Sequence, residues 1–240
     1  MSTISFADGR ETDKLTGCQK ACTFELDFQK MLDESEKKGQ NLTLVGLDID
    51  GLMRLNDEFG HQTGDEVLKE IAAILLDIDA EHSTYRYSGD HFTLLFPEAE
   101  KEQVFLLMEE VRKKITAAPK CSQTSGTVSM GIATYPEDGS RNIDIFRKAD
   151  GALYRAKASG RNKIALAKEE KLVTKTAHYT TEQLKRLENL SGETGISEAA
   201  LLREALDELL KKYLRAKDSR VGLPCPTELP CPTAITTNDV

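Results

Sequence analysis

Apolar residues in the first two-thirds of the chain recur at two different spacings. Helical spacing predicts helices at residues 15–35, 67–78, 99–117 and 143–159. Short apolar runs bounded by turn-forming residues predict strands at residues 41–50, 83–87, 92–96, 126–134 and 163–167, the last at a sheet edge. The predicted order is therefore helix, then strand–helix–strand–strand–helix–strand–helix, followed by the edge strand at 163–167.

The inner part of this order matches the ferredoxin-like split βαβ unit. It predicts an α+β fold of the ferredoxin-like or palm type, with a central antiparallel sheet. A tight turn, Ser88-Gly89-Asp90-His91, joins two of its neighbouring strands.

A different pattern follows at residues 172–217, where a short strand candidate precedes two amphipathic helices. Thr180 and Gln183 form a capping box that opens the first helix, and Gly192 and Gly195 are expected to end it. Two short helices bury too little apolar surface to be stable alone, so this segment is expected to pair with a partner.

The last segment, residues 218–240, repeats LPCPTE as LPCPTA and is rich in proline. Dense proline blocks both helix and sheet, so this tail is expected to be disordered. The sequence thus predicts three parts: a domain at 13–167, a small dimerisation module at 172–217 and the tail.

Composition limits the classes of partner and the cellular location that can be expected. The net charge of −8 makes non-specific nucleic-acid binding unfavourable, so any DNA contact must come from a local surface. No run is apolar enough for a membrane span, and the N-terminus does not resemble a secretory signal. Five cysteines without paired CxxC motifs are typical of free thiols in a reducing compartment. The expected location is the cytoplasm.

Carboxylates gather where the predicted strands end. Asp48 and Asp50 close the strand at 41–50, and Asp90 lies in the turn between the next two strands. If the first strand continues through both residues, Asp48 and Asp50 share a face, and if it stops at Asp48 the direction of Asp50 is open. Neighbouring strands can bring Asp48 and Asp90 to one cation, and carboxylate and phosphate oxygens are ligands that Mg²⁺ prefers. Solvated strand-end acids are the simpler alternative.

A basic pair follows much later. Lys157 and Arg161 lie four residues apart near the end of a predicted helix. Together they are suited to a triphosphate, because arginine binds two phosphate oxygens at once. Basic residues in a last helical turn also simply complement the helix dipole.

Four motifs carry a family resemblance: DIDGLMRLNDEFGHQTGDEVL, RYSGDHF, TVSMGIATYPEDG and ADGALYRAKASGRN, in this order and after an opening DKLTGC. Residues 13–167 resemble the GGDEF family of diguanylate cyclases. The resemblance implies a domain that binds GTP with Mg²⁺ or Mn²⁺ and condenses two GTP molecules to cyclic di-GMP and two pyrophosphates. Each domain would present one GTP, so two chains must meet.

The resemblance also implies roles for individual residues. Asp48, the backbone carbonyl of Ile49 and Asp90 correspond to metal ligands, and Gly89 lets the turn approach the nucleotide. Nucleotide contacts are implied for Asn56 and Asp65 at the guanine edge and for Lys157 and Arg161 at the terminal phosphates.

The sequence departs from the family at several points, and three of them bear on function. His91 replaces a glutamate of the signature; a neutral imidazole can act as a general base but is a poor Mg²⁺ ligand. The stretch Asp79-Ala-Glu-His82 lacks the RxxD motif at which cyclic product inhibits many members. Met53 stands where a lysine is common. These changes are thus expected to affect catalytic turnover more than GTP binding.

The segment at 172–217 resembles the Arc-like ribbon–helix–helix family, in which two chains pair their strands into a ribbon that enters the DNA major groove. The resemblance implies a homodimer in which Thr174, Thr176 and His178 face DNA while Ala177 and Tyr179 face inward. A plain helical hairpin used only for dimerisation is the alternative.

Two functions from different classes follow. One is a diguanylate cyclase coupled to a DNA-binding dimer module, with Asp48, Asp90 and His91 at the catalytic centre. The other is a catalytically degenerate transcription regulator that senses GTP or cyclic di-GMP, which His91 favours. An antitoxin-like binder of another protein is a third, lesser option.

Overall fold

The computed structural model describes residues 11–168, 176–194, 197–199, 201–206 and 209–210. The chain divides into two compact units, Met1–Leu172 and Val173–Val240. Each unit is described by itself.

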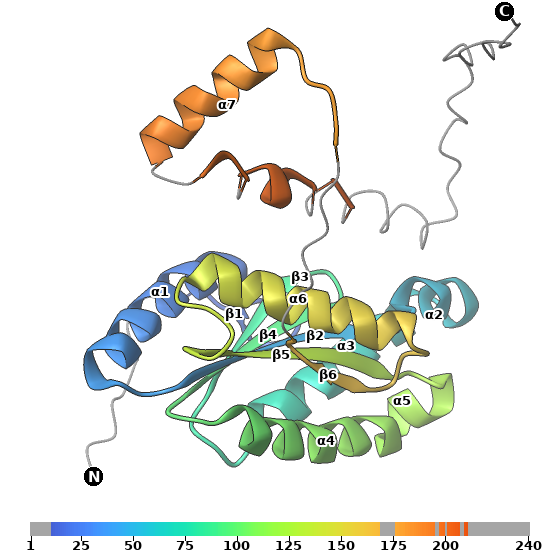
Figure 1. Cartoon of the computed structure of the whole chain (residues 1–240). Helices are drawn as coiled ribbons and strands as arrows, with labels where there is room; N and C mark the ends of the chain where they lie inside the picture. Colours follow the sequence, from blue (N-terminus) through green and yellow to red (C-terminus); the bar gives the residue numbers. More distant parts are fainter. Residues whose placement is uncertain (1–10, 169–175, 195–196, 200, 207–208, 211–240) are drawn as a thin grey trace, which may run out of the picture. The chain divides into compact units, whose positions relative to one another are not determined.

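A mixed six-stranded sheet forms the centre of the first unit, in the order β1-β3-β4-β2-β5-β6 (Figure 1). The strands are β1 Gln19–Lys20, β2 Leu42–Ile49, β3 Ser83–Ser88, β4 His91–Pro97, β5 Val128–Tyr135 and β6 Ile164–Leu166. The inner pairs are antiparallel, as predicted, whereas the outer pairs β1–β3 and β5–β6 are parallel. The predicted last strand is confirmed at the sheet edge.

Helices cover both faces of this sheet (Figure 1). They are α1 Ala21–Lys38, α2 Leu52–Phe59, α3 His61–Leu76, α4 Lys101–Ala117, α5 Pro119–Thr124 and α6 Asn142–Ala158. Apolar residues of α1 and α6 pack on one face, and those of α3 and α4 pack on the other. Two helices, α2 and α5, were not predicted, because each is short and buries few apolar side chains.

The alternation of side chains along β2 determines which of its residues face each layer of helices. Val45, Leu47 and Ile49 pack with α3 and α4, whereas Leu42 and Leu44 pack with α1 and α6. Because successive strand residues point to opposite faces, the same alternation places Asp48 on the α6 face. On β4, Phe92, Leu94 and Phe96 fill the α3–α4 side, so the preceding His91 also belongs to the α6 face.

The second unit contains α7, Thr181–Thr194. Its predicted capping box is confirmed: the backbone N–H of Gln183 donates to Thr180 Oγ1 (3.2 Å), and the backbone N–H of Thr180 donates to Gln183 Oε1 (2.9 Å). The expectation that Gly192 ends this helix is wrong, since α7 continues through it; a helix tolerates one interior glycine at about 1 kcal/mol. Gly195 lies outside the described residues.

Residues 198–199, 201–206 and 209–210 are helical, and residues 176–180 form neither helix nor strand. The tail at 218–240 lies outside the described residues. No helix in the described part of the chain is long and apolar enough to cross a membrane.

Candidate functional site

Asp48 and His91 face each other at one end of the sheet. The antiparallel register of β2 and β4 sets Asp48 directly opposite His91. The Nδ1 atom of His91 lies 3.8 Å from Oδ2 of Asp48, and both residues are buried. This distance is too long for a hydrogen bond, so the contact is electrostatic.

A lysine from α6 reaches the same carboxylate. Lys157 Nζ lies 2.7 Å from Asp48 Oδ1. The helix sits close to the sheet because Gly131 of β5 has no side chain: a Cβ there would overlap the backbone of Ala149 and Leu153. The sequence therefore brings Lys157 to Asp48 through close helix–sheet packing.

Asp90 completes the acidic part of the cluster. The backbone N–H of Ile49 donates to the Asp90 carbonyl (3.2 Å), which ties the end of β2 to the β3–β4 turn. Burial and the negative charge of Asp48 raise the pKa of Asp90 above its ordinary value. Burial alone would also raise the pKa of Asp48, but His91 and Lys157 more than offset burial and hold that pKa below its ordinary value.

The turn that carries Asp90 is held by an arginine. Arg86 Nε and Nη2 donate to the Gly89 carbonyl (3.1 and 2.8 Å), and Nη1 donates to Asp13 Oδ2 (3.0 Å). Gly89 has φ +31° and open space around its Cβ position, so backbone conformation rather than crowding requires glycine here. The role of Arg86 was not predicted from the sequence, because its partner Asp13 lies 73 residues away.

Asp50 makes its hydrogen bonds outside this cluster. Its carboxylate accepts hydrogen bonds from Thr127 Oγ1 (2.8 Å), Ser129 Oγ (2.7 Å) and the backbone N–H of Asn162 (3.0 Å). Strand β2 ends at Ile49, which resolves the alternative left open by the sequence. Asp50 thereby anchors the turn after α6, where Arg161 adopts φ +61° with an exposed side chain.

The two residues expected at a guanine edge lie on neighbouring helices. Asn56 is in α2 and half-buried, whereas Asp65 is in the first turns of α3 and exposed. Within the described residues, Oδ1 of Asn56 is buried and has no hydrogen-bond partner. An unmet acceptor of this kind is uncommon in folded proteins, and this oxygen packs against Gly64 of α3.

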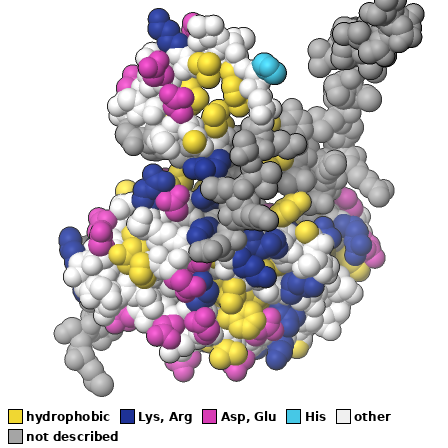
Figure 2. Space-filling model, in the orientation of Figure 1, with side chains coloured by type: hydrophobic (Ala, Val, Ile, Leu, Met, Phe, Trp, Pro, Cys, Tyr) yellow, Lys and Arg dark blue, Asp and Glu magenta, His cyan; other side chains and the backbone are white. Residues whose placement is uncertain are grey.

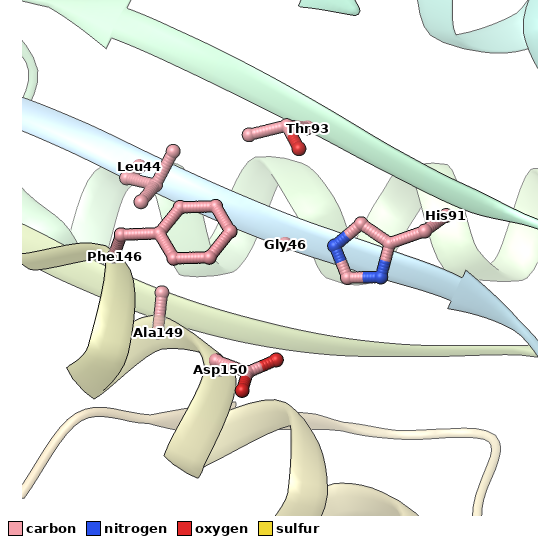
Figure 3. Close-up of a pocket in the computed structure, with 7 residues that line it drawn as sticks. All are labelled: Leu44, Gly46, His91, Thr93, Phe146, Ala149 and Asp150. Atoms are coloured by element: carbon pink, nitrogen blue, oxygen red, sulfur yellow. The ribbon is translucent and has the colours of Figure 1, made fainter. Parts of the chain in front are cut away.

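His91 lines a small pocket between the sheet and α6 (Figure 3). The pocket is bounded by Leu44, Gly46, His91, Thr93, Phe146, Ala149 and Asp150. The imidazole of His91 is therefore enclosed between the sheet and α6, and only 7% of the residue is exposed to solvent. A substrate hydroxyl has little direct access to this ring.

The donor set suits a hard divalent cation. Among the described residues, no cluster of three or more His, Cys, Asp and Glu side chains could hold a metal ion, so the protein offers two carboxylates, Asp48 and Asp90, and backbone carbonyl groups. Mg²⁺ is commonly held by one or two carboxylates together with water and phosphate oxygens. Because the negative charge of Asp48 disfavours the ionised form of the half-buried Asp90, a bound cation would stabilise the Asp90 carboxylate.

The residues expected to contact DNA belong to the second unit. Thr176 and His178 are exposed in the segment that precedes α7, and Thr174 lies outside the described residues. In a two-chain ribbon, each strand forms its backbone hydrogen bonds with the strand of the other chain, so a single chain lacks the partner strand.

Comparison with known proteins adds two family matches. The family described as "Diguanylate cyclase, GGDEF domain" matches residues 10–163, and the family described as "Ribbon-helix-helix domain" matches residues 175–214. The chain is 36% identical over 160 residues to diguanylate cyclase DgcP of Pseudomonas aeruginosa, covering 65% of this chain and 24% of that protein. It also matches a diguanylate cyclase of Vibrio cholerae, at 29% identity, covering 50% of that protein.

Solved structures agree with the first match. The GGDEF domain of DgcB from Caulobacter crescentus, in complex with c-di-GMP, is similar with a TM-score of 0.61 and 30% identity, over 69% of this chain and 98% of that one. The active GGEEF domain of a diguanylate cyclase from Vibrio cholerae is similar with a TM-score of 0.60 and 28% identity, over 64% and 99%. The chain thus spans a quarter to a half of these curated relatives and nearly all of the isolated domains.

Proposed function

Because the chain belongs to the GGDEF family of diguanylate cyclases, we propose that its first unit binds GTP and condenses two GTP molecules to cyclic di-GMP and two pyrophosphates. The observation that carries this proposal is the convergence of Asp48, Asp90 and Lys157 at one end of the sheet. Two carboxylates beside an ammonium group can bind a metal–triphosphate, since they provide both hard oxygen ligands and a phosphate partner.

Each residue has a distinct task in this proposal. Asp65 accepts hydrogen bonds from the guanine N–H groups, the Asn56 amide can both donate to and accept from the guanine edge, and Lys157 and Arg161 hold the terminal phosphates. Asp48, Asp90 and the carbonyl of Ile49 would hold Mg²⁺ or Mn²⁺, which when bound stabilises charge on the reacting phosphate.

The condensation needs two chains. The 3′-hydroxyl of each GTP attacks the α-phosphate of the other, so two phosphodiester bonds form and two pyrophosphates leave. Positioning by the sites of both chains supplies much of the rate, because the reaction becomes effectively unimolecular.

His91 favours a second candidate function. Where the family has a carboxylate, this chain has a buried imidazole beside Asp48, which adds no negative charge for a metal. A protein that binds GTP or cyclic di-GMP without turnover, and passes the binding to a DNA-binding unit, would retain the fold and the phosphate-binding residues. The products formed from GTP distinguish these two functions.

The second unit supports a homodimer that binds DNA through its ribbon. Hydrophobic side chains gather on the visible face of this unit (Figure 2), and exposed apolar residues among those described are Tyr179, Leu184, Leu190, Leu206, Leu209 and Leu210. A second copy would cover such a surface, as in other ribbon–helix–helix proteins. Dimerisation would also raise the effective concentration of one cyclase domain for the other.

Asp65→Ala tests the guanine assignment. We expect this variant to bind GTP with Mg²⁺ about tenfold more weakly, because guanine N–H donors lose a charged acceptor. Calorimetric titration of GTP and ATP provides the measurement, with the exposed Asp79→Ala as the control. Equal affinities of the parent protein for ATP and GTP would refute the guanine site.

Removal of residues 169–240 tests the assembly. The full-length chain is expected to sediment as a dimer at micromolar concentration, and the truncated chain as a monomer, since the apolar surface of α7 is removed. Analytical ultracentrifugation measures both masses. A monomeric full-length chain would reject the intertwined ribbon.

A further inference from the structure

The orientation of Asn56 depends on a glycine in the next helix. Gly64 is a buried residue of α3. A Cβ at this position would overlap Oδ1 of Asn56 and lie 2.9 Å from its Cγ. The amide group of Asn56 therefore occupies the space that any side chain at position 64 would need.

No backbone requirement explains this glycine. Gly64 is absent from the glycines with positive φ, so its conformation is one that alanine adopts readily. Within a helix, glycine is also less favourable than alanine. Gly64 thus makes α3 less stable than alanine would, and its lack of a side chain leaves space for the Asn56 amide.

The backbone of Asn56 is fixed independently. Its carbonyl accepts a hydrogen bond from the Gly60 N–H (2.9 Å) at the junction of α2 and α3. Any adjustment to a larger residue at position 64 must therefore come from rotation of the Asn56 side chain. That rotation would move the amide away from its present orientation.

We propose that Gly64 is a positioning residue for guanine recognition, because it leaves the Asn56 amide the single orientation in which it meets the base. This inference rests on the proposed binding of GTP. The proposed function concerns residues that would contact guanine directly, whereas Gly64 would act only through Asn56. A side chain at position 64 should cost guanine selectivity without cost to the fold.

The test compares four variants of the full-length chain: Gly64→Ala, Asn56→Ala, the double variant and Gly192→Ala. The last is a matched control, since Gly192 is also helical and a Cβ there meets nothing within 4 Å. Binding is measured by calorimetry with Mg²⁺ and GTP or ATP analogues that carry a methylene group between the α- and β-phosphates. Such analogues bind without reacting.

Gly64→Ala is expected to weaken binding of the guanine analogue on the order of tenfold, the effect of one lost hydrogen bond in a buried site, and to leave the adenine analogue unchanged. Its unfolding temperature should stay level or rise by up to about 4 °C, as an added alanine in a helix predicts. The double variant should bind no more weakly than Asn56→Ala alone, because both changes remove the same contact.

Several results would overturn the inference. If Asn56→Ala weakens guanine binding and Gly64→Ala does not, the positioning role fails while GTP binding stands. If Asn56→Ala has no effect, the guanine assignment and the inference fail together. A Gly64→Ala variant that unfolds, that loses both analogues equally, or whose effect adds to that of Asn56→Ala would show that Gly64 serves packing alone.

Discussion

Asp48→Ala should reduce cyclic di-GMP synthesis by about 10³-fold or more, because a metal site that stabilises the reaction by several kcal/mol loses its principal ligand. Asp48 is the residue on which the cluster converges: Lys157 contacts Oδ1 at 2.7 Å and His91 lies 3.8 Å from Oδ2. The loss of this carboxylate also leaves Lys157 without its partner. Product formation by purified protein, resolved by liquid chromatography, measures the effect.

Two companion experiments separate chemistry from folding. The unfolding temperature of Asp48→Ala should stay close to that of the parent, since removal of one buried charge also relieves its repulsion of Asp90. Asp79→Ala removes an exposed carboxylate from the turn between α3 and β3, at the other end of β3 from the signature turn, and should retain activity. Full activity in Asp48→Ala would contradict the proposed site.

His91→Glu should raise cyclic di-GMP synthesis above the parent, by about tenfold for each 1.4 kcal/mol of transition-state stabilisation that it restores. The imidazole is buried beside Asp48 and lends a metal no negative charge. A glutamate adds a third carboxylate to a pair in which Asp90 already has a raised pKa. The variant should therefore unfold at a lower temperature in EDTA and recover when Mg²⁺ and GTP are present.

His91→Gln is the matched control, because glutamine resembles glutamate in size but carries no charge. It should show no gain in activity and no comparable dependence of stability on Mg²⁺. If glutamate and glutamine both abolish an activity that the parent possesses, the imidazole itself takes part in the reaction, and the account of His91 as a lost ligand is wrong.

The sequence predicts most of the first unit because its strands are strongly apolar and its long helices carry clear stripes. The strands at 41–50, 83–87, 92–96 and 126–134 correspond to β2, β3, β4 and β5. The short helix α2 escapes prediction because only Leu52 and Leu55 are buried on it. The part of the prediction that named Gly192 as a helix end was wrong, because the helix that the capping box at Thr180 starts continues through this one glycine.

The contacts of the candidate site were likewise predicted only in part. That Asp48 and Asp90 approach each other follows from strand order, and Lys157 follows from the family resemblance. The role of Asp50 was open because it depends on where β2 stops, which the residues alone do not fix. Contacts such as Arg86–Asp13 join distant segments and become visible only when the sheet is assembled.

Incubation of the purified full-length protein with GTP and Mg²⁺, followed by separation of the products, tests the central claim most directly. Cyclic di-GMP and pyrophosphate should form in a 1:2 ratio, with no cyclic product from ATP. If the parent protein and His91→Glu both bind GTP and neither forms cyclic di-GMP, the cyclase function is contradicted and the nucleotide-sensing function is favoured.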